Sequence, residues 1–288
     1  MTATLMDGVA AARRVYADLA PRVAALKAKG IVPGLATVLV GDDPASAVYV
    51  RNKIKACREA GMFSEDVHLP ASCSQPELLA TVESLNTNPA IHGIIVQLPL
   101  PKHLDPNPVV QAIAAHKDVD GFHRTNLGAL VAGEIVLAPG TPLGILRLLD
   151  DYGITIDGRH AVVVGRGPTV GRPLALMLIA RGATVTVCNS RTPDLASFTR
   201  RADILIAATG KAGLITGDMV KPGAAVVDVG ISRLPSGKIT GDVDFASAKE
   251  VAAHISPVPG GVGPMTVSML IANTVLAAER GTAAGLSA

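Results

Sequence analysis

A tyrosine and a lysine lie four residues apart in the stretch GDDPASAVYVRNKIKACREAGM, residues 41–62. Asp43 followed by Pro44 is typical of a helix start, because Asp caps the first turn and Pro lacks only a donor that would have no partner there. On that helix Tyr49 and Lys53 share one face, which we expect to be buried. Burial lowers the pKa of an amine from its reference value of about 10.4, so this lysine is a candidate base.

The same helix provides a control for this interpretation. Arg51, Lys55 and Arg58 follow three- and four-residue spacing on the other face, which we expect to be solvated. Lys55 therefore has the chemistry of Lys53 on the opposite face, and we expect its loss to be tolerated.

Two other motifs bring polar side chains to the ends of apolar runs. Gln97 ends the run in GIIVQLPLP, residues 93–101, and ligands of parallel sheets bind at the carboxyl ends of strands. Its amide either contacts a ligand or satisfies a loop. In HKDVDGFH, residues 116–123, Asp118 and Asp120 come just before a glycine. They either cap a turn or present a carboxylate to a nitrogen heterocycle.

The segment SPVPGGVGPMT, residues 256–266, holds three prolines and three glycines. This composition builds a stiff loop with exposed backbone groups, whereas a linker is more often polar and loose. We interpret the loop, including Pro259, Gly260 and Gly261, as a wall against which a flat substrate lies. A helix is predicted to start directly after it, at Thr266.

VVVGRGPTVGRP, residues 162–173, follows an apolar strand and opens a helix, as a dinucleotide-binding turn does. Gly165 and Gly167 allow a tight turn and close approach of a phosphate, and Gly171 lets the helix lie against the sheet. Because the spacing is G-x-G-x-x-x-G rather than G-x-G-x-x-G, a plain strand–turn–helix is the alternative. Its place within a run of four strands favours dinucleotide binding.

The strand after this turn predicts the choice of cofactor. An NAD-specific site carries an Asp or Glu about 20 residues on, which holds the ribose 2′-hydroxyl. This strand instead ends in VTVCNSRT, and Arg166, Ser190 and Arg191 can hydrogen-bond a 2′-phosphate. The sequence therefore favours NADP, with a solvated loop cation as the alternative role of Arg191.

Strands and helices alternate along the chain, which predicts an α/β protein with parallel sheets covered on both faces. Two apolar runs form an early group, and four more at a spacing of about 20 residues form a second group typical of a Rossmann-type unit. We place the domain junction near residue 140. Residues 1–140, completed by a C-terminal helix over 266–288, form a substrate domain, and residues 141–265 form the Rossmann-type domain, with a cleft between them. The six runs are LATVLVG, IHGIIVQLPLP, HAVVVGRG, ATVTVCNS, ADILIAATG and AAVVDVGIS.

Composition argues against several classes of function. The 288 residues are 49% hydrophobic with a net charge of +2, and no basic stripe indicates binding to nucleic acid. The N-terminus has no apolar signal region, and we expect prolines and glycines to break the apolar stretch 251–278 into pieces too short to span a membrane. Three widely separated cysteines predict a reducing, cytosolic setting, and no Cys or His cluster indicates a metal.

Four motifs in this order resemble the bifunctional methylenetetrahydrofolate dehydrogenase/cyclohydrolase family. They are Y-x-x-x-K at Tyr49 and Lys53, VQLPLP at Gln97, KDVDGF at Asp120 and PVPGGVGPMT at 257–266. The resemblance covers nearly the whole chain. It implies an NADP-linked oxidation of 5,10-methylenetetrahydrofolate to 5,10-methenyltetrahydrofolate, and then hydrolysis to 10-formyltetrahydrofolate. It also implies a homodimer made through the nucleotide domain and a role in one-carbon metabolism.

The resemblance assigns roles to individual positions. Lys53 matches the catalytic lysine of the family, and Gln97 matches its hydrogen-bonding partner. Tyr49 matches the ring that stacks on the aminobenzoyl part of folate, and Asp120 matches the carboxylate that anchors the pterin. The positions that match cofactor contacts are Gly165 to Gly167, Ser190 and Ile231.

Three positions depart from the family pattern. Gly167 stands where the nucleotide loop usually has serine, which removes a hydroxyl donor and keeps the backbone amide. Gly140 replaces the cysteine of P-C-T-P, so no thiol chemistry is assigned there, and Asn189 stands where histidine is frequent. The first and third departures bear on cofactor affinity.

These roles support a mechanism in which the two steps make different demands. Hydride transfer depends chiefly on position, whereas hydrolysis needs a group that takes a proton from water. Our hypothesis is that Lys53, held by Gln97, activates the water or shuttles its proton, while Asp120 orients the pterin. The alternatives are a monofunctional NAD-linked dehydrogenase and a nucleotide-sensing regulator, although a sensor needs none of these three side chains.

Overall fold

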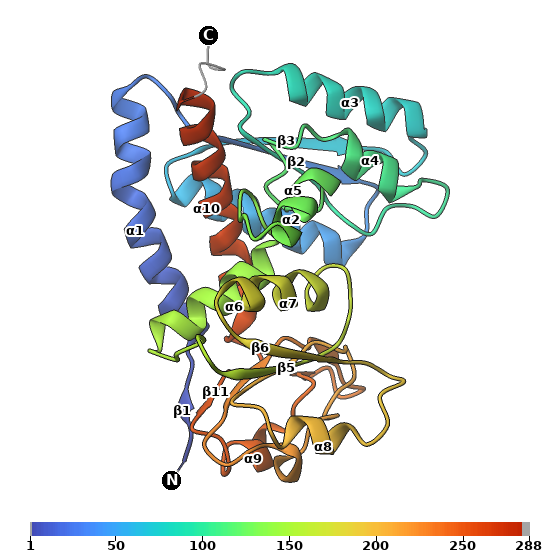
Figure 1. Cartoon of the computed structure of the whole chain (residues 1–288). Coiled ribbons are helices and arrows are strands. Elements are labelled where there is room, and N and C mark those ends of the chain that lie inside the picture. The colour runs from blue at the N-terminus through green and yellow to red at the C-terminus, as the bar shows by residue number, and fades with distance from the viewer. Residues whose placement is uncertain (1, 284–288) are drawn as a thin grey trace. The chain divides into compact units, whose positions relative to one another are not determined.

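The computed structural model describes residues 2–283 of the chain (Figure 1). The chain forms two compact units, each built on a parallel sheet. The large-sheet unit consists of residues 2–13 and 141–266, and the small-sheet unit consists of residues 14–140 and 267–283. Each unit is an α/β fold, as the alternation of strands and helices predicted.

The large-sheet unit contains six parallel strands. In their order across the sheet they are β1 (Thr4–Leu5), β11 (His254–Ile255), β8 (Ala225–Asp228), β7 (Ile204–Ala207), β5 (His160–Val164) and β6 (Thr184–Cys188). The last four of these form the Rossmann-type group that the sequence predicted. β1 and β11 were not predicted, because two-residue strands show no periodicity. The chain passes from β5 to β6 on one side and to β7 on the other, so the topological switch point lies between β5 and β7.

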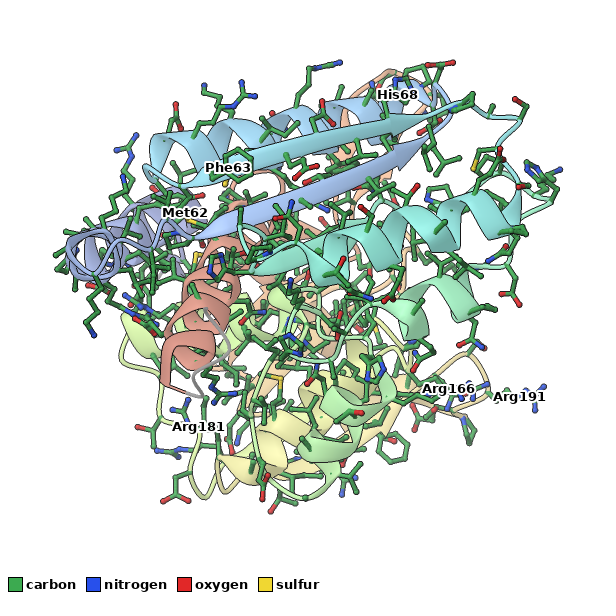
Figure 2. The ribbon with its side chains drawn as sticks, turned by 90° about the horizontal axis from the view of Figure 1, so that it is seen from above. Met62, Phe63, His68, Arg166, Arg181 and Arg191 are labelled. Atoms are coloured by element: carbon green, nitrogen blue, oxygen red, sulfur yellow. The ribbon has the colours of Figure 1, made fainter. Side chains whose placement is uncertain are left out.

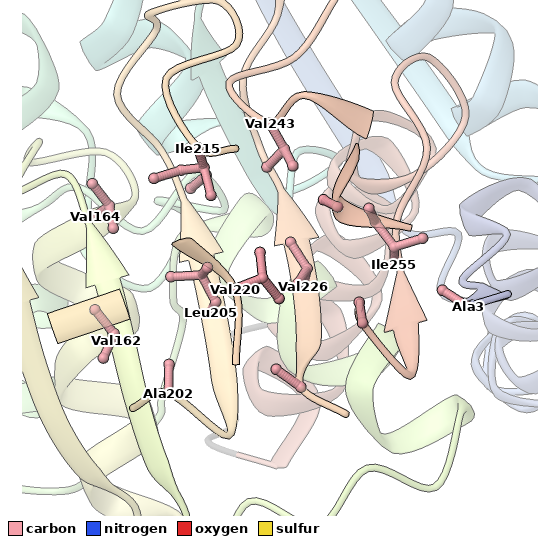
Figure 3. Packing of buried hydrophobic residues seen from close by; sticks show 14 of the residues in the cluster. Ala3, Val162, Val164, Ala202, Leu205, Ile215, Val220, Val226, Val243 and Ile255 are labelled. Atoms are coloured by element: carbon pink, nitrogen blue, oxygen red, sulfur yellow. The ribbon is translucent and has the colours of Figure 1, made fainter. Parts of the chain in front are cut away.

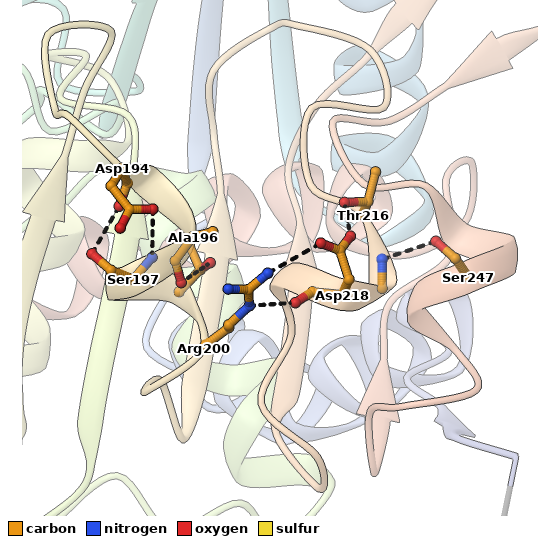
Figure 4. Close-up of polar contacts among 9 residues, drawn as sticks. Asp194, Ala196, Ser197, Arg200, Thr216, Asp218 and Ser247 are labelled. Carbon is orange, nitrogen blue, oxygen red and sulfur yellow. Dashed lines mark hydrogen bonds and ion pairs between the residues drawn. The ribbon is translucent and has the colours of Figure 1, made fainter.

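Helices and short elements complete this unit. They are α6 (Gly140–Asp151), α7 (Gly171–Ala180), α8 (Leu195–Thr199), the 3-10 helix η1 (Gly217–Met219), the strands β9 (Ser232–Arg233) and β10 (Ile239–Thr240), and α9 (Phe245–Ala248). Side-chain contacts hold α8, η1 and α9 together (Figure 4). Asp194 caps α8, Arg200 Nε donates a 2.6 Å hydrogen bond to the Asp218 carbonyl, and Ser247 Oγ accepts from the first amide of η1 at 2.9 Å. These contacts join α8, η1 and α9 into one layer.

An apolar cluster covers one face of the large sheet (Figure 3). Val162 and Val164 of β5, Leu205 of β7 and Val226 of β8 belong to it, and each is at most 1% exposed. Val162 and Val164 alternate along their strand, which places both on the same face. Burial of each such side chain stabilises the fold by about 1.5–3 kcal/mol. The cluster therefore fixes β5, whose carboxyl end carries the glycine turn, against its neighbouring strands.

The small sheet contains three parallel strands. In their order across the sheet they are β3 (Phe63–Leu69), β2 (Gly34–Val40) and β4 (Gly93–Val96). β2 and β4 are the two early apolar runs that the sequence predicted. β3 was missed, because its sequence FSEDVHL mixes charged and apolar residues as an exposed edge strand does. Figure 2 labels Phe63 and His68 near its two ends.

Four helices belong wholly to the small-sheet unit. They are α2 (Pro44–Glu59), α3 (Gln75–Thr87), α4 (Pro106–Ala112) and α5 (Arg124–Val131). α2 begins as predicted, because the Asp43 side chain accepts a 2.7 Å hydrogen bond from the Ser46 amide and Pro44 is the first helical residue. α3 packs its buried side chains Leu78 and Val82 in one cluster with β2 and β4.

Two helices, α1 (Gly8–Ala28) and α10 (Val262–Ala283), continue from one unit into the other along the chain. β1 precedes α1 and pairs with β11, so the first residues of the chain, which we had assigned to the substrate domain, lie in the large-sheet unit. Arg22 of α1 and Glu279 of α10 form a two-bonded ion pair, at 2.9 and 2.6 Å, inside the small-sheet unit. The predicted C-terminal helix included residues 284–288, which lie outside the described residues.

α10 begins at Val262 rather than at the predicted Thr266. Gly263 and Pro264 fall in its first turn, where an amide has no helical partner and proline is tolerated. The segment Val262–Gly281 is long and apolar enough to cross a membrane, so the expectation that prolines and glycines leave too short a helix is wrong. Within the structure 61% of this segment's apolar window is buried, which is typical of a core helix.

Candidate active site

Lys53 and Gln97 meet near the carboxyl edge of the small sheet. The chain runs from β2 to β3 on one side and to β4 on the other, so the switch point lies between β2 and β4. Gln97 follows β4 directly, and its backbone N–H donates a hydrogen bond to the Val38 carbonyl of β2 at 2.9 Å. Lys53 Nζ, on α2, donates to Gln97 Oε1 at 3.1 Å. The structure therefore brings together two predicted site residues that are 44 positions apart in sequence.

Exposure along α2 differs from the predicted pattern. Val50 and Ile54 are buried and pack on Leu39 of β2, and Ser46, Ala56 and Cys57 of the same helix are buried as well. Lys53 is half-buried at the border of this stripe, whereas Tyr49 is 49% exposed. The prediction of a buried face is therefore wrong for Tyr49 and holds only in part for Lys53, whereas Ala56 of the same predicted face is buried.

The basic face of α2 is solvated, as predicted. Arg51, Lys55 and Arg58 are all exposed. Lys55 Nζ lies 3.8 Å from Glu59 Oε1, in a pair that is exposed on both sides. Such pairs contribute at most about 1 kcal/mol, so Lys55 remains a matched control for Lys53.

Asp118 and Asp120 have different surroundings. Asp118 is 1% exposed, and its carboxylate accepts hydrogen bonds from the Gly121 amide (3.1 Å), the His123 amide (2.7 Å) and Asn126 Nδ2 (2.9 Å). Burial raises the pKa of Asp118. Asp120 is half-buried, and no residue between positions 2 and 283 donates a hydrogen bond to its carboxylate. Asp118 therefore caps the turn, whereas the Asp120 carboxylate takes no part in capping it.

α10 fixes this turn through one asparagine that the sequence analysis missed. Asn273 is 4% exposed, and its Nδ2 donates to the carbonyls of Val119 and Ala138, both at 2.8 Å. Gly121 has a φ of 74°, and a Cβ there would lie 2.4 Å from the Ala138 carbonyl carbon. An amide side chain within an apolar helix was the available signal, because such a group is buried only with partners.

Lys117 is a second residue that the sequence analysis missed. It is 8% exposed, and its Nζ donates to the carbonyls of Leu85 (3.3 Å), Asn86 (2.7 Å) and Asn88 (2.9 Å). These carbonyls end α3, so the ammonium group caps the negative end of that helix. Burial lowers the pKa of Lys117. The role of Lys117 is structural. Because Lys117 directly precedes Asp118, its contacts also anchor the start of the turn that Asp118 caps.

The glycine turn follows β5, at the switch point of the large sheet. Gly165 has a φ of 124°, and a Cβ there would lie 2.1 Å from the Ala208 carbonyl oxygen after β7. A Cβ on Gly171 would lie 2.0 Å from the Gly165 carbonyl oxygen, so the turn and the start of α7 are in direct contact. A Cβ on Gly167 would have no atom within 4 Å. Packing therefore requires glycine at 165 and 171 and leaves position 167 open.

The side chains assigned to a 2′-phosphate lie at two neighbouring strand ends. β5 and β6 pair with Val164 opposite Cys188, so Arg166 and Ser190 each follow within two residues of paired strand ends. Arg166, Ser190 and Arg191 are exposed. In the view of Figure 2, Arg166 and Arg191 both extend outward on the same side. The two loops can therefore address one anionic group.

Asn189, which stands where the family often has histidine, shapes the loop after β6. Its side-chain Oδ1 accepts a 3.0 Å hydrogen bond from the Arg191 backbone N–H, and its own backbone N–H donates to Thr192 Oγ1 at 2.9 Å. This is an Asx-type turn. Asn189 thus sets the direction in which the loop presents Ser190 and Arg191.

The proline-glycine loop belongs to the large-sheet unit and packs on the start of α1. The Gly8 amide donates to the Gly260 carbonyl at 2.9 Å, and a Cβ on Gly8 would lie 1.6 Å from the Gly261 carbonyl oxygen. Gly261 is buried, Gly260 is half-buried with a φ of 101°, and Pro259 is exposed. The loop is therefore supported from one side and presents Pro259 on the other.

Ile231 lies between β8 and β9 and is 58% exposed, so its side chain is accessible to a ligand. Among residues 2–283 no group of three or more His, Cys, Asp or Glu side chains is arranged to hold a metal ion. What the large-sheet unit offers is a glycine turn, cations and an apolar side chain at the carboxyl edge of parallel strands.

A parallel sheet with a glycine turn at its switch point defines the dinucleotide-binding class of α/β proteins, here joined to a second α/β unit with a lysine and an amide at its own switch point. The catalytic domain of tetrahydrofolate dehydrogenase/cyclohydrolase matches residues 6–120, and the NAD(P)-binding domain of the same family matches residues 139–282. The chain therefore belongs to the tetrahydrofolate dehydrogenase/cyclohydrolase family.

Relatives and solved structures agree with this assignment. The chain is 58% identical over 280 residues to the bifunctional protein FolD of Bordetella avium, with 97% of this chain and 99% of that protein covered. It is 57% identical over 284 residues to the protein of the same name from Burkholderia pseudomallei strain 1106a, with 99% and 100% covered.

Among solved structures, the bifunctional enzyme FolD of Campylobacter jejuni matches with a TM-score of 0.94 and 49% identity, over 96% of this chain and 99% of that one. FolD of Trypanosoma brucei, solved with NADP and an inhibitor, matches with a TM-score of 0.92 and 40% identity, over 98% and 99%. These matches confirm the predicted family and the two-domain α/β fold class.

Proposed function

We propose that this protein oxidises 5,10-methylenetetrahydrofolate to 5,10-methenyltetrahydrofolate with NADP and hydrolyses the product to 10-formyltetrahydrofolate. The chain is a bifunctional enzyme of one-carbon metabolism, and both of its halves match the family that carries out the two reactions. One observation supports assigning the chemistry to particular residues. Lys53 Nζ donates a hydrogen bond to Gln97 Oε1 at the switch point of the small sheet. A nucleotide sensor needs neither side chain.

Oxidation depends on holding the donor carbon against the cofactor, and this chain supplies position rather than acid–base chemistry. NADP, when bound, accepts the hydride. The turn from Gly165 to Gly167 and the first amides of α7 bind its phosphates, because Gly165 keeps the backbone close and the helix N-terminus carries partial positive charge. Arg166, Ser190 and Arg191 bind the 2′-phosphate. The loop after β6 reads NSRT, so no carboxylate repels that group.

Hydrolysis requires water to add to an electrophilic C=N⁺ carbon and to lose a proton. Lys53 is the base in this proposal. Gln97 Oε1 accepts one N–H of the Lys53 side chain, which fixes the direction of the nitrogen toward the water that it activates or whose proton it shuttles. Position and proton transfer thus come from the same hydrogen-bonded pair.

Folate is held by groups that are accessible in the structure. The ring of Tyr49 is 49% exposed and stacks on the aminobenzoyl group. The Asp120 carboxylate accepts hydrogen bonds from pterin N–H groups, which a carboxylate does well because the bonds are charge-assisted. The loop of Pro259, Gly260 and Gly261 is proposed to offer the substrate a flat surface, with Pro259 as its exposed residue.

The protein is further proposed to be a cytoplasmic homodimer formed through the large-sheet unit. β6 is an edge strand, and Val187 on it is 40% exposed, while Ile179 on the neighbouring α7 is 56% exposed. An apolar sheet edge of this kind suits pairing with a second copy. Light scattering of the full chain tests this directly: a dimer mass supports the proposal, and a monomer at micromolar concentration contradicts it.

One coupled assay tests the enzyme proposal. The full chain is mixed with 5,10-methylenetetrahydrofolate and either NADP or NAD, and the absorbances of the reduced cofactor and of the methenyl product are followed together. The bifunctional enzyme forms NADPH while the methenyl signal rises and then decays faster than without protein. A monofunctional dehydrogenase accumulates methenyl product in step with the reduced cofactor, and a sensor produces neither signal.

A further inference from the structure

Two carboxylates are buried near the carboxyl edge of the large sheet. Asp228 is the last residue of β8 and is 4% exposed, and Asp242 lies shortly after β10 and is 0% exposed. A Cβ built on Gly230 would lie 2.2 Å from Asp242 Oδ1, and one built on Gly241 would lie 1.9 Å from Asp228 Oδ2. The two glycines therefore make room for the two acids.

Asp228 joins the loop after β8 to the segment around Asp242. Its Oδ1 accepts hydrogen bonds from the amides of Gly230 (3.0 Å) and Asp242 (2.9 Å), and its Oδ2 accepts from the amide of Val243 (3.0 Å). Three backbone amides from two loops thus converge on one carboxylate.

Asp242 continues this network to the loop after β7. Its Oδ2 accepts three hydrogen bonds, from the Thr209 amide (2.5 Å), from Thr209 Oγ1 (3.0 Å) and from the Gly210 amide (3.0 Å). Together the two acids connect the loops that follow β7 and β8.

Burying these two carboxylates carries a desolvation penalty that lowers the stability of the fold. Two neighbouring acids are desolvated, and burial, with the charge of Asp242 adding to it, raises the pKa of Asp228 to about 6. Asp242 Oδ1 has no hydrogen-bond partner among residues 2–283. A buried charge cluster of this kind is weak evidence for stability, so the explanation lies in the geometry that it enforces.

The loops that the acids hold are those that line the proposed cofactor site. The carbonyl of Ala208, directly before Thr209, meets the glycine turn at Gly165. Ile231, a predicted cofactor contact, follows Gly230 directly. We propose that Asp228 and Asp242 are positioning residues for NADP, which hold the loop after β7 against the glycine turn and the loop after β8 at Ile231. This inference rests on the cofactor site proposed above.

The test compares Asp242→Ala with Asp242→Asn in the full-length enzyme. Asp242→Ala removes the acceptor of the Thr209 and Gly210 amides, and we expect the KM for NADP to rise about tenfold while kcat falls less than threefold. Asn keeps one carbonyl oxygen for those amides, so Asp242→Asn should restore the KM to within about threefold of wild type. Asp218→Asn, an exposed acid of the same unit, is the control and should leave the KM unchanged.

Several outcomes would overturn the proposal. A KM for NADP within twofold of wild type in Asp242→Ala, or a fall in kcat without a change in KM, would show that the acids only stabilise the fold. If Asp242→Ala does not fold, Thr209→Val decides, because it removes one donor and keeps both amides; an unchanged KM there also refutes the role. Calorimetric titration of NADP gives the same contrast in Kd without turnover, so a wild type that binds NADP but is inactive refutes the proposed reactions and not this role.

Discussion

Replacing Gly165 with alanine should disable the nucleotide turn. The backbone at this position has a φ of 124°, which residues with a Cβ rarely adopt, and the added Cβ would lie 2.1 Å from the Ala208 carbonyl oxygen. An ordinary contact between these atoms requires at least about 3.4 Å, so the turn or the carbonyl must move by about 1 Å. The carbonyl precedes the loop that Asp242 holds, which leaves it little freedom to move.

The cost of this substitution has two parts. An unfavourable backbone conformation costs about 1–3 kcal/mol, and overpacking costs about another 1–3 kcal/mol. The sum, about 2–6 kcal/mol, is a large share of the 5–15 kcal/mol that stabilises a typical protein. We therefore expect the Tm to fall by at least about 5 °C. A displacement of about 1 Å at a binding site can reduce kcat/KM about 100-fold, which we expect for NADP.

Thermal unfolding and the NADP dependence of dehydrogenase turnover measure both effects. Gly167→Ala is the matched control, because it adds the same methyl group where no atom lies within 4 Å, and its Tm should stay within about 2 °C of wild type. If Gly165→Ala behaves like Gly167→Ala in both assays, the steric reasoning about the turn is wrong.

Three further predictions follow from the contacts described above. Lys117→Met leaves three carbonyls at the end of α3 without their donor, and the free energy of unfolding in urea should fall by about 2–4 kcal/mol; a loss below about 0.5 kcal/mol would contradict the capping role. The raised pKa of Asp228 means that the folded state binds the extra proton between about pH 4 and pH 6, so this residue's contribution to stability falls as the pH rises through that window. The stability of wild type relative to Asp228→Asn should therefore be greater at pH 4.5 than at pH 7, and a pH-independent difference would count against it. The double variant of Arg166 and Ser190 to alanine should raise the KM for NADP at least about tenfold and change that for NAD less than threefold; equal effects on both cofactors would exclude a 2′-phosphate role.

Long apolar strands could be predicted from sequence, whereas short or polar ones could not. β5 and β7 are continuous aliphatic runs that are buried on both faces, and strands of this kind can be predicted directly from the sequence. β3 is a seven-residue strand, but it mixes charged with apolar residues because it lies at the edge of the small sheet. β1 and β11 exist only through their pairing with each other and with β8, which is a long-range contact.

The candidate site shows the same division. Tyr49, Lys53 and Gln97 were identified from spacing, strand ends and resemblance, but the exposure of Tyr49 depends on which side chains meet Leu39, and spacing alone does not decide that. Asn273 was missed because its partners are more than a hundred positions away.

The buried acids Asp228 and Asp242 were missed for a related reason. Their motif reads as an ordinary strand end and loop, and only the fold reveals that both are buried and that they accept six hydrogen bonds from three loops. Groups that position others therefore escape a search for residues with reactive chemistry.

The central claim is that Lys53 acts as the base in hydrolysis, and the rate at which Lys53→Met hydrolyses 5,10-methenyltetrahydrofolate tests it most directly. Loss of a general base reduces turnover by about 10²–10⁴-fold, so the rate of this variant should fall by at least about 100-fold. Lys55→Met, which removes the same group from the solvated face of α2, should remain within about twofold of wild type. A Lys53→Met enzyme that hydrolyses the substrate at a rate close to that of Lys55→Met would contradict the account.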